Sequence, residues 1–176
     1  QDMARAYVLS LAASDAFDQA FSELVRLNNA APAPLDGTLS ELMGLLSPNA
    51  RDPEFLTHTI GATAGMRVDI DDTVGNDIAA RLMSPGFPGE AGEFVAPLAQ
   101  GAAERARKLI RAEIALLNER PRQAELELLG ESGDDVQKII ARARSMAGDH
   151  AAAQQIFARL NSNEDAERQA FLDGDW

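Results

Sequence analysis

Apolar residues recur along most of the chain at the three- to four-residue spacing of amphipathic helices. No long stretch alternates apolar and polar residues, so the pattern disfavours a sheet. We therefore expect an all-α protein. The predicted helices cover residues 2–12, 15–29, 38–46, 73–83, 89–99, 102–117, 121–129, 134–146, 151–160 and 164–172, with one more opened by Pro53. In the first helix, Met3, Tyr7 and Leu11 share one face.

Short polar side chains mark where several of these helices begin. Thr38, Asp71 or Asp72, and Asp134 each stand at or just before the start of a predicted helix, where a side-chain oxygen can accept a hydrogen bond from a backbone N–H of the first turn. Residues 61–70 are the least periodic stretch and are predicted to form a loop.

An internal repeat is the most informative signal. The segments 15–24, 86–95, 119–128 and 148–157 align without gaps. Each contains an alanine followed four residues later by a larger apolar residue, in the pairs Ala20/Leu24, Ala91/Val95, Ala124/Leu128 and Ala153/Phe157.

The residues twelve positions before these alanines are also small or medium-sized: Val8, Ala79, Ala112 and Ala141. Small side chains on both helices at a crossing point let an antiparallel pair approach closely, and the larger residue one turn on fills the space beside the contact. The repeat therefore predicts helix hairpins that nest through these positions.

This pattern resembles the tetratricopeptide family, whose unit has a small residue in the first helix, a Gly-Asp-aromatic turn, an alanine in the second helix and a bulky residue four positions later. Gly148-Asp149-His150 with Ala153 and Phe157 is the closest match. The aromatic positions of the family's first helix are not kept, and the unit around Phe55 lacks the alanine. The resemblance implies antiparallel helix hairpins stacked as a right-handed α-solenoid.

The repeat predicts one helical domain over residues 1–176. Its approximate units are 2–34, 38–66, 72–100, 102–131, 134–162 and a partial unit 164–176. Gly174-Asp175-Trp176 repeats the turn of the preceding unit, and a second helix is expected to follow such a turn. We therefore expect the chain to be a fragment of a longer protein.

Composition narrows the function classes. The net charge of −12 disfavours nucleic acid as a partner, because the surface repels phosphates. The absence of cysteine excludes disulfides, thiolate catalysis and cysteine-bound zinc. No apolar run approaches the roughly 20 residues that span a bilayer, so no membrane insertion is expected. An Ala- and Arg-rich, Lys-poor composition suggests a bacterial source. Cysteine-free chains occur in both the bacterial cytoplasm and the periplasm, so a soluble protein of either compartment is expected.

Candidate chemistry is sparse, and we predict no catalytic, cofactor-binding or metal-binding residues. His58 and His150 belong to different units; His58 is expected on a helix surface and His150 in the packing position of its turn. The acidic run that begins at Asp69 lacks the glycine and glutamate of a calcium loop, since Val74 and Ala80 occupy those positions.

A basic cluster on one predicted helix leaves two interpretations open. Arg105, Arg107, Lys108 and Arg111 are arranged so that they could contact an acidic partner. Alternatively they form a solvated helix face, which the favourable i,i+4 spacing of Glu104 and Lys108 supports.

The family resemblance implies a concave groove lined by the first helix of each hairpin. The residues that it places there are Thr73, Asn76, Glu113, Lys138 and Arg142. Lys138 and Arg142 lie one turn apart, a spacing that suits binding of a carboxylate or an acidic peptide. The leading hypothesis is a non-enzymatic scaffold that presents this groove to a peptide or a partner domain. The alternatives are a structural spacer or an oligomerisation segment that associates through exposed repeat ends, and, least favoured, an enzyme with an unrecognised helical site.

Overall fold

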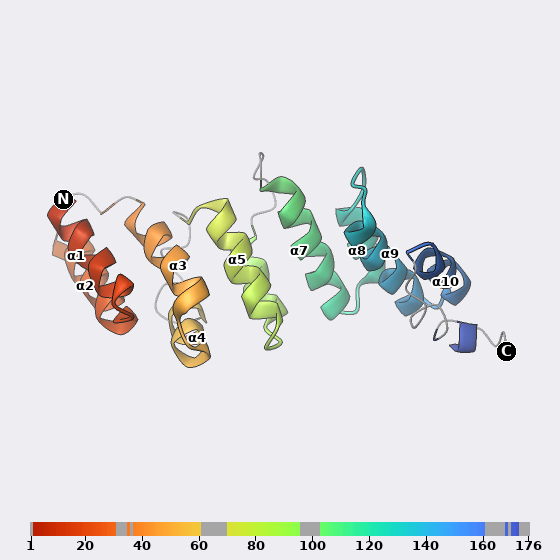
Figure 1. Ribbon diagram of the computed structural model, residues 1–176, viewed down its shortest axis with the longest axis horizontal. Coiled ribbons are helices and arrows are strands. Elements are labelled where there is room, and N and C mark those ends of the chain that lie inside the picture. Colours follow the sequence, from red (N-terminus) through yellow and green to blue (C-terminus); the bar gives the residue numbers. More distant parts are fainter. Residues whose placement is uncertain are drawn as a thin grey trace. The chain divides into compact units, whose positions relative to one another are not determined.

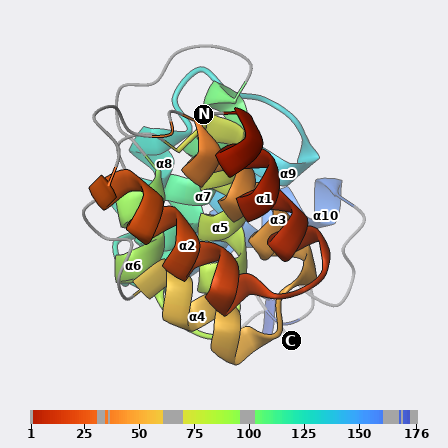
Figure 2. The same ribbon diagram turned by 90° about the vertical axis from the view of Figure 1, so that its left-hand side faces the viewer.

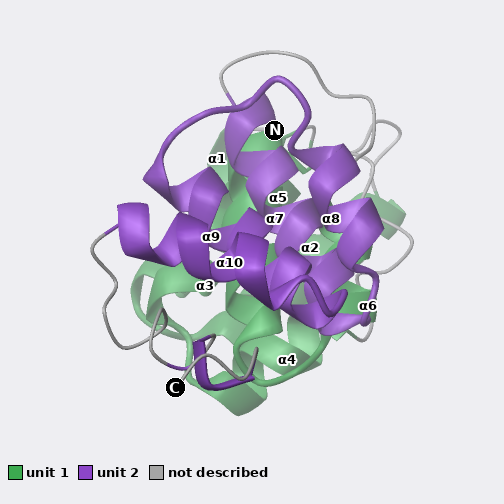
Figure 3. Ribbon diagram, turned by 90° about the vertical axis from the view of Figure 1, so that its right-hand side faces the viewer, with its two compact units in different colours: residues 1–96 green, residues 97–176 purple. Residues whose placement is uncertain are grey.

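The structure, a computed structural model, describes residues 2–30, 35, 37–60, 70–95, 103–160, 168 and 170–172. These residues are helical or lie in turns, which confirms the all-α prediction. The chain divides into two compact units, residues 1–96 and residues 97–176, which are coloured separately in Figure 3. All but the last residue of the loop predicted over 61–70, and the turn predicted at 174–176, lie outside the described residues.

Each unit is built from helices that are labelled in Figure 1. The helices of the first unit are α1 (Asp2–Ala13), α2 (Phe17–Ala30), α3 (Thr38–Asn49), α4 (Asp52–Ile60), α5 (Asp72–Met83) and α6 (Pro88–Phe94). Those of the second unit are α7 (Glu104–Leu117), α8 (Pro121–Glu127), α9 (Asp134–Met146) and α10 (His150–Arg159).

Four pairs of successive helices pack against each other as hairpins: α1 with α2, α5 with α6, α7 with α8, and α9 with α10. Figure 2 faces the antiparallel pair α1 and α2. Within the first unit α3 packs against α1, α2 and α5, and within the second unit α9 packs against both α7 and α8. The α1–α2 hairpin therefore contacts α3 through both of its helices, and the α7–α8 hairpin contacts α9 through both of its helices.

The four hairpins share one turn. In each turn a single residue has a left-handed backbone, and these residues are Asp15 (φ 59°), Gly86 (φ 93°), Glu119 (φ 57°) and Gly148 (φ 87°). The N–H of the following residue donates to the carbonyl five positions earlier, at N···O distances of 2.9, 3.0, 2.8 and 2.9 Å respectively. This is the 6→1 bond of a Schellman motif. Each left-handed residue lies five positions before a matched alanine, so the sequence repeat and the turns have the same register.

The eight matched small positions are all fully buried, with relative exposures of 0%. The larger residues four positions after the alanines are buried as well. Ala112 and Ala124 belong to one core cluster, and Ala141 and Ala153 belong to another. The predicted burial of these positions is therefore confirmed.

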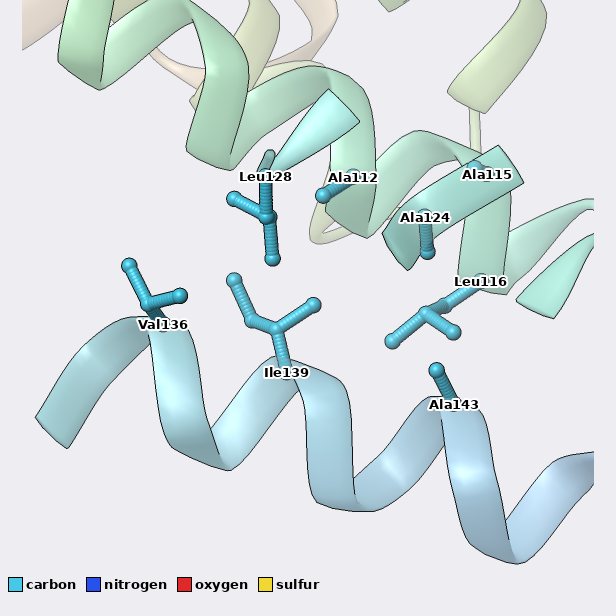
Figure 4. Close-up of a cluster of buried hydrophobic side chains, with 8 residues drawn as sticks. All are labelled: Ala112, Ala115, Leu116, Ala124, Leu128, Val136, Ile139 and Ala143. Carbon is cyan, nitrogen blue, oxygen red and sulfur yellow. The ribbon is translucent and has the colours of Figure 1, made fainter. Parts of the chain in front are cut away.

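The first of these clusters forms the core of the second unit (Figure 4). Val136, Ile139 and Ala143 on α9 face Leu128 and Leu116, which come from the α7–α8 hairpin. Because the alanines of α7 and α8 are short, α9 lies across both helices of the preceding hairpin.

Two helix starts differ from the prediction. Asp71 caps α5 as predicted, because its carboxylate accepts from the backbone N–H two residues later at 2.8 Å. The predicted caps Thr38 and Asp134 are wrong, since each is the first residue of its helix. Gly37 (φ 72°) and Gly133 (φ 122°) precede them, and a left-handed glycine brings the chain into the helix without a side-chain cap.

The end of α3 also differs from the prediction. The helix continues past residue 46 to Asn49 and holds Pro48 in its last turn. Arg81 on α5 donates to the carbonyl oxygens of Ser47 and Ala50, the latter at 2.6 Å. A cation that satisfies the last carbonyls of a helix stabilises its C-terminus, so α5 helps to end α3.

The side of α1 that carries Met3 and Tyr7 faces solvent. Their relative exposures are 88% and 54%. Val8, the matched position, and Ala12 form the buried side of α1 instead, and α1 packs against α2. A large apolar residue is thus a poorer guide to the buried face here than the repeat register.

Candidate functional site

The five predicted groove residues are distributed over both units. Thr73 and Asn76 lie on α5 in the first unit, whereas Glu113 lies on α7, and Lys138 and Arg142 lie on α9, in the second. The structure brings Glu113 and Arg142 together. The candidates of the first unit and those of the second unit therefore belong to separate surfaces.

On α5 the two candidates have different environments. Thr73 is exposed in the first turn, and its backbone N–H is bonded to the capping carboxylate of Asp71. Asn76 is only 5% exposed. It lies one turn before the buried Ala79 and beside Gly75, on the side of α5 that packs inward. Its amide is therefore not presented to solvent, although a polar side chain on a helix predicts an outward position.

On α7 and α9 the candidates form a small charged surface. Nη1 of Arg142 donates to both carboxylate oxygens of Glu113, at 2.8 Å each, so this pair ties α9 to α7. Lys138 is exposed one turn before Arg142 and takes part in no ion pair or hydrogen bond that the structure describes. We call Glu113, Lys138 and Arg142 the first-helix face. Because Glu113 neutralises Arg142, Lys138 is the cation of this face that is open to a ligand.

The basic cluster on α7 is occupied by contacts within the chain. Three of its members pair with acidic residues of the segment that runs from the end of α8 to the start of α9, and the partners follow in antiparallel order. The pairs are Arg111 with Glu127 (2.7 and 2.8 Å), Lys108 with Glu131 (2.7 Å) and Arg105 with Asp135 (2.8 Å at both contacts). We call this arrangement the ion-pair ladder. The i,i+4 pair Glu104–Lys108 is also present, at 3.6 Å.

The ladder accounts for the shifted ionisation in this region. A hydrogen bond from Arg105 lowers the pKa of Asp135 to about 2. Bonds to Glu131 and Glu127 raise the pKa values of Lys108 and Arg111. Arg107 is 3% exposed. The cluster is thus neither a free basic patch nor a simple solvated face; it binds the α8–α9 connection to α7.

An apolar groove lies between α8 and α9. It has a volume of about 490 Å³, and its walls include Leu126 and Leu129, which are 65% and 69% exposed. Leu128 and Ile140 form its floor, and Arg122 and Arg144 border it. We call it the α8–α9 groove. Sequence reasoning missed it, although the run Glu-Leu-Glu-Leu-Leu at 125–129 is a usable signal, because a helix that ends at residue 127 cannot bury three leucines on one face.

Leu126 and Leu129 also line a second cleft of about 230 Å³ on the side that faces α7. Its other walls are members of the ion-pair ladder, among them Lys108, Arg111 and Glu127. The two leucines therefore form a ridge between an apolar groove and a charged one.

The first unit has a cleft of its own, of about 420 Å³, which Phe55 and Arg81 border. The guanidinium carbon of Arg81 lies 4.1 Å from the centre of the Phe55 ring.

His58 lies in the core of the first unit and not on a helix surface as predicted. It is 8% exposed, and its ring stacks on Phe21 with centroids 4.1 Å apart and planes inclined by 9°. Its Nε2 lies 2.7 Å from Oδ1 of Asp18, so His58 joins α4 to α2 through a ring contact and a polar contact. His150 is the half-buried first residue of α10.

Among the described residues, no three histidine, cysteine, aspartate or glutamate side chains gather in a way that could hold a metal ion. None of the described helices has the length and apolar character needed to cross a membrane. No protein-family model, curated protein or solved structure matches the chain.

Proposed function

We propose that the chain is a non-enzymatic protein-interaction scaffold made of tetratricopeptide-like helix hairpins, and that the first-helix face of α7 and α9 binds a peptide or partner domain that carries a carboxylate. The observation that carries this proposal is the recurrence of one hairpin design. Four hairpins share a left-handed turn residue five positions before a buried alanine. Stacked units of this kind form rigid surfaces suited to protein binding.

The chemistry of the first-helix face supports a carboxylate ligand. Lys138 is exposed and carries a charge that no neighbour neutralises within the described residues. Arg142 is oriented by Glu113, so its remaining N–H groups have a fixed direction. A ligand carboxylate beside Lys138 would thus meet one free ammonium group and a guanidinium group one turn away.

A second function is favoured by a separate observation. Met3 and Tyr7 on α1 and Val25 on α2 are large apolar residues exposed on the first hairpin. Exposed apolar side chains that gather on one hairpin are suited to association with another repeat or another copy. The alternative proposal is therefore a structural spacer or an oligomerisation segment of a larger protein.

The primary proposal is tested by selecting peptides from a random displayed library on the full 176-residue chain and measuring their affinities by fluorescence anisotropy. We expect the selected peptides to carry a carboxylate and to bind the Lys138→Glu variant at least about tenfold more weakly, as expected for loss of a charge-assisted contact. Arg159→Glu, a charge reversal at an exposed position on α10, is the matched control and should leave binding unchanged.

Two results would contradict the primary proposal: a library that yields no saturable binder, or binders with equal affinity for Lys138→Glu and the native chain. Sedimentation equilibrium tests the alternative. If the chain self-associates and the double variant Met3→Ser, Tyr7→Ser is monomeric, the oligomerisation function is favoured instead.

A further inference from the structure

We infer that the α8–α9 groove is a second interaction site, which binds an amphipathic helical segment of a partner protein with apolar side chains on one face and carboxylates beside them. The site is separate from the first-helix face, because none of Glu113, Lys138 and Arg142 lines it. The inference rests on the groove's exposed apolar walls, its fixed floor and its charge.

The exposed walls supply the apolar part of the site. Leu126 and Leu129 are each about two-thirds exposed, and both belong to one short stretch at the end of α8. The volume of about 490 Å³ falls within the roughly 300–1,000 Å³ typical of ligand pockets. An amphipathic helix that inserts apolar side chains here would remove both leucines from water.

The floor and one wall are held in place before any ligand binds. Leu128 is a member of the unit's core cluster, and Ile140 packs against both core clusters. The ion pairs Arg111–Glu127 and Lys108–Glu131 bind the segment that carries the leucine ridge to α7. A preformed surface costs less ordering entropy on binding than a mobile one.

The charges around the groove select an acidic ligand. Arg144 pairs with Glu125 at 2.6 Å and lies 3.7 Å from Asp149, so its charge is compensated. Arg122 is exposed and has no ion pair or hydrogen bond that the structure describes. Among the lining residues of the groove, Arg122 therefore carries the charge that no neighbouring carboxylate compensates within the described residues.

Because salt screens distant charges, the charges at the groove itself determine which ligand charge is favoured there. Charges more than about 8 Å away are largely screened at physiological ionic strength, so the acidic character of the whole chain matters less than the groups at the groove. The nearby acidic residues Glu127 and Glu131 are already paired with cations of the ladder. The preferred occupant is therefore a segment whose carboxylates can reach the exposed guanidinium group of Arg122.

The test uses a designed, fluorescein-labelled helical peptide of about 16 residues, with leucines at i, i+3, i+7 and i+10 and glutamates beside them, on the full chain. A matched peptide has lysines in place of the glutamates. We expect saturable binding of the glutamate peptide, weaker binding of the lysine peptide, and an affinity for the glutamate peptide that falls as salt is added.

Substitutions in and outside the α8–α9 groove show where the glutamate peptide binds. Arg122→Glu should weaken the glutamate peptide at least about tenfold, and Leu126→Ser with Leu129→Ser should do the same, since about tenfold corresponds to one buried leucine contact. Arg159→Glu and Leu117→Ser replace an exposed arginine and an exposed leucine elsewhere in the unit and should change the affinity less than about twofold. Circular dichroism verifies that each variant keeps its helicity.

Lys138→Glu separates this inference from the proposed function. Binding of the glutamate peptide should be unchanged in that variant, and a loss there would place the peptide on the first-helix face and overturn the inference. The inference is equally overturned if the peptide does not saturate, if the lysine peptide binds as tightly, or if Arg122→Glu has no effect. It is also overturned if the chain dimerises in solution and the leucine double variant makes it monomeric, because a second copy would then occupy the groove.

Discussion

Arg105 and Asp135 form a two-point ion pair between α7 and the first turn of α9, with Nη1–Oδ2 and Nη2–Oδ1 distances of 2.8 Å. The same guanidinium group donates to the carbonyl oxygen of Ser132 at 3.0 Å. This arrangement ends the ion-pair ladder and fixes where α9 begins. Stability at acidic pH should therefore depend on this carboxylate.

The pKa of Asp135 is lowered in the folded chain from its ordinary value of 3.8 to about 2. The folded state thus releases this proton more readily than the unfolded state, so the carboxylate stabilises the fold above pH 3.8 and loses that contribution as the pH falls toward 2. We expect Asp135→Asn to lower the free energy of unfolding near neutral pH and to approach that of the native chain as the pH falls to about 2 and below. Urea unfolding between those limits measures the difference.

The neighbouring Asp134 is the matched control. It shares the helix start with Asp135, and so the same helix dipole, but forms no ion pair that the structure describes. Asp134→Asn should show a smaller difference from the native chain. Equal effects of the two substitutions would contradict a specific role for the pair with Arg105.

Gly75 on α5 should tolerate no larger residue. A Cβ at this position would lie 2.6 Å from the backbone carbonyl oxygen of Phe94 on α6. Alanine favours a helix by about 1 kcal/mol over glycine, but overpacking costs about 1–3 kcal/mol, so Gly75→Ala should lower the free energy of unfolding. Gly92 on α6 has no atom within 4 Å of a built Cβ, and Gly92→Ala should be neutral or stabilising. Urea unfolding compares the two variants, and a stabilised Gly75→Ala would contradict the close approach of α5 and α6.

We expect the packing of the His58 ring to contribute more to the free energy of unfolding than the polar contact between His58 and Asp18. His58→Ala removes the stack on Phe21 and empties a buried position, which should cost about 2–4 kcal/mol. Asp18→Ala removes only an exposed partner, whose side chain is 75% exposed, and should cost less than about 1 kcal/mol. Chemical denaturation of both variants measures the two free energies, and the opposite ranking would show that the polar contact dominates.

The matched alanines should admit no bulky side chain. Ala153 on α10 is fully buried in the same cluster as Ala141 on α9, so Ala153→Leu should destabilise the chain by about 1–3 kcal/mol. Ala158 is exposed on the same helix, and Ala158→Leu should change the stability by less than about 0.5 kcal/mol. Thermal unfolding of both variants measures the effect, and a neutral Ala153→Leu would contradict close packing at this position.

The repeat register was the most predictive part of the sequence. It located the small residues that are buried and the turns that precede them, because close helix packing demands small side chains at fixed spacing. Amphipathic pattern alone was less reliable. Met3 and Tyr7 are apolar but exposed, since the buried side of α1 is chosen by its contact with α2.

Features that depend on contacts between distant segments were not predictable. His58 is buried because Phe21 and Asp18 on another helix receive it, and nothing in the local sequence at residue 58 specifies them. The pairing of Arg111 with Glu127 depends in the same way on how α8 packs on α7. The tetratricopeptide resemblance and the groove residues that it implies stay predictions.

The turn that the four hairpins share bears on how the chain unfolds locally. Each hairpin closes through a backbone bond between its own residues, such as the bond from the N–H of Arg120 to the carbonyl oxygen of Ala115. Amide hydrogen exchange should therefore reveal hairpins opening one at a time, with protection that differs between hairpins and is shared by the two helices of each. A protease should then cut the chain first within the hairpin that is least protected.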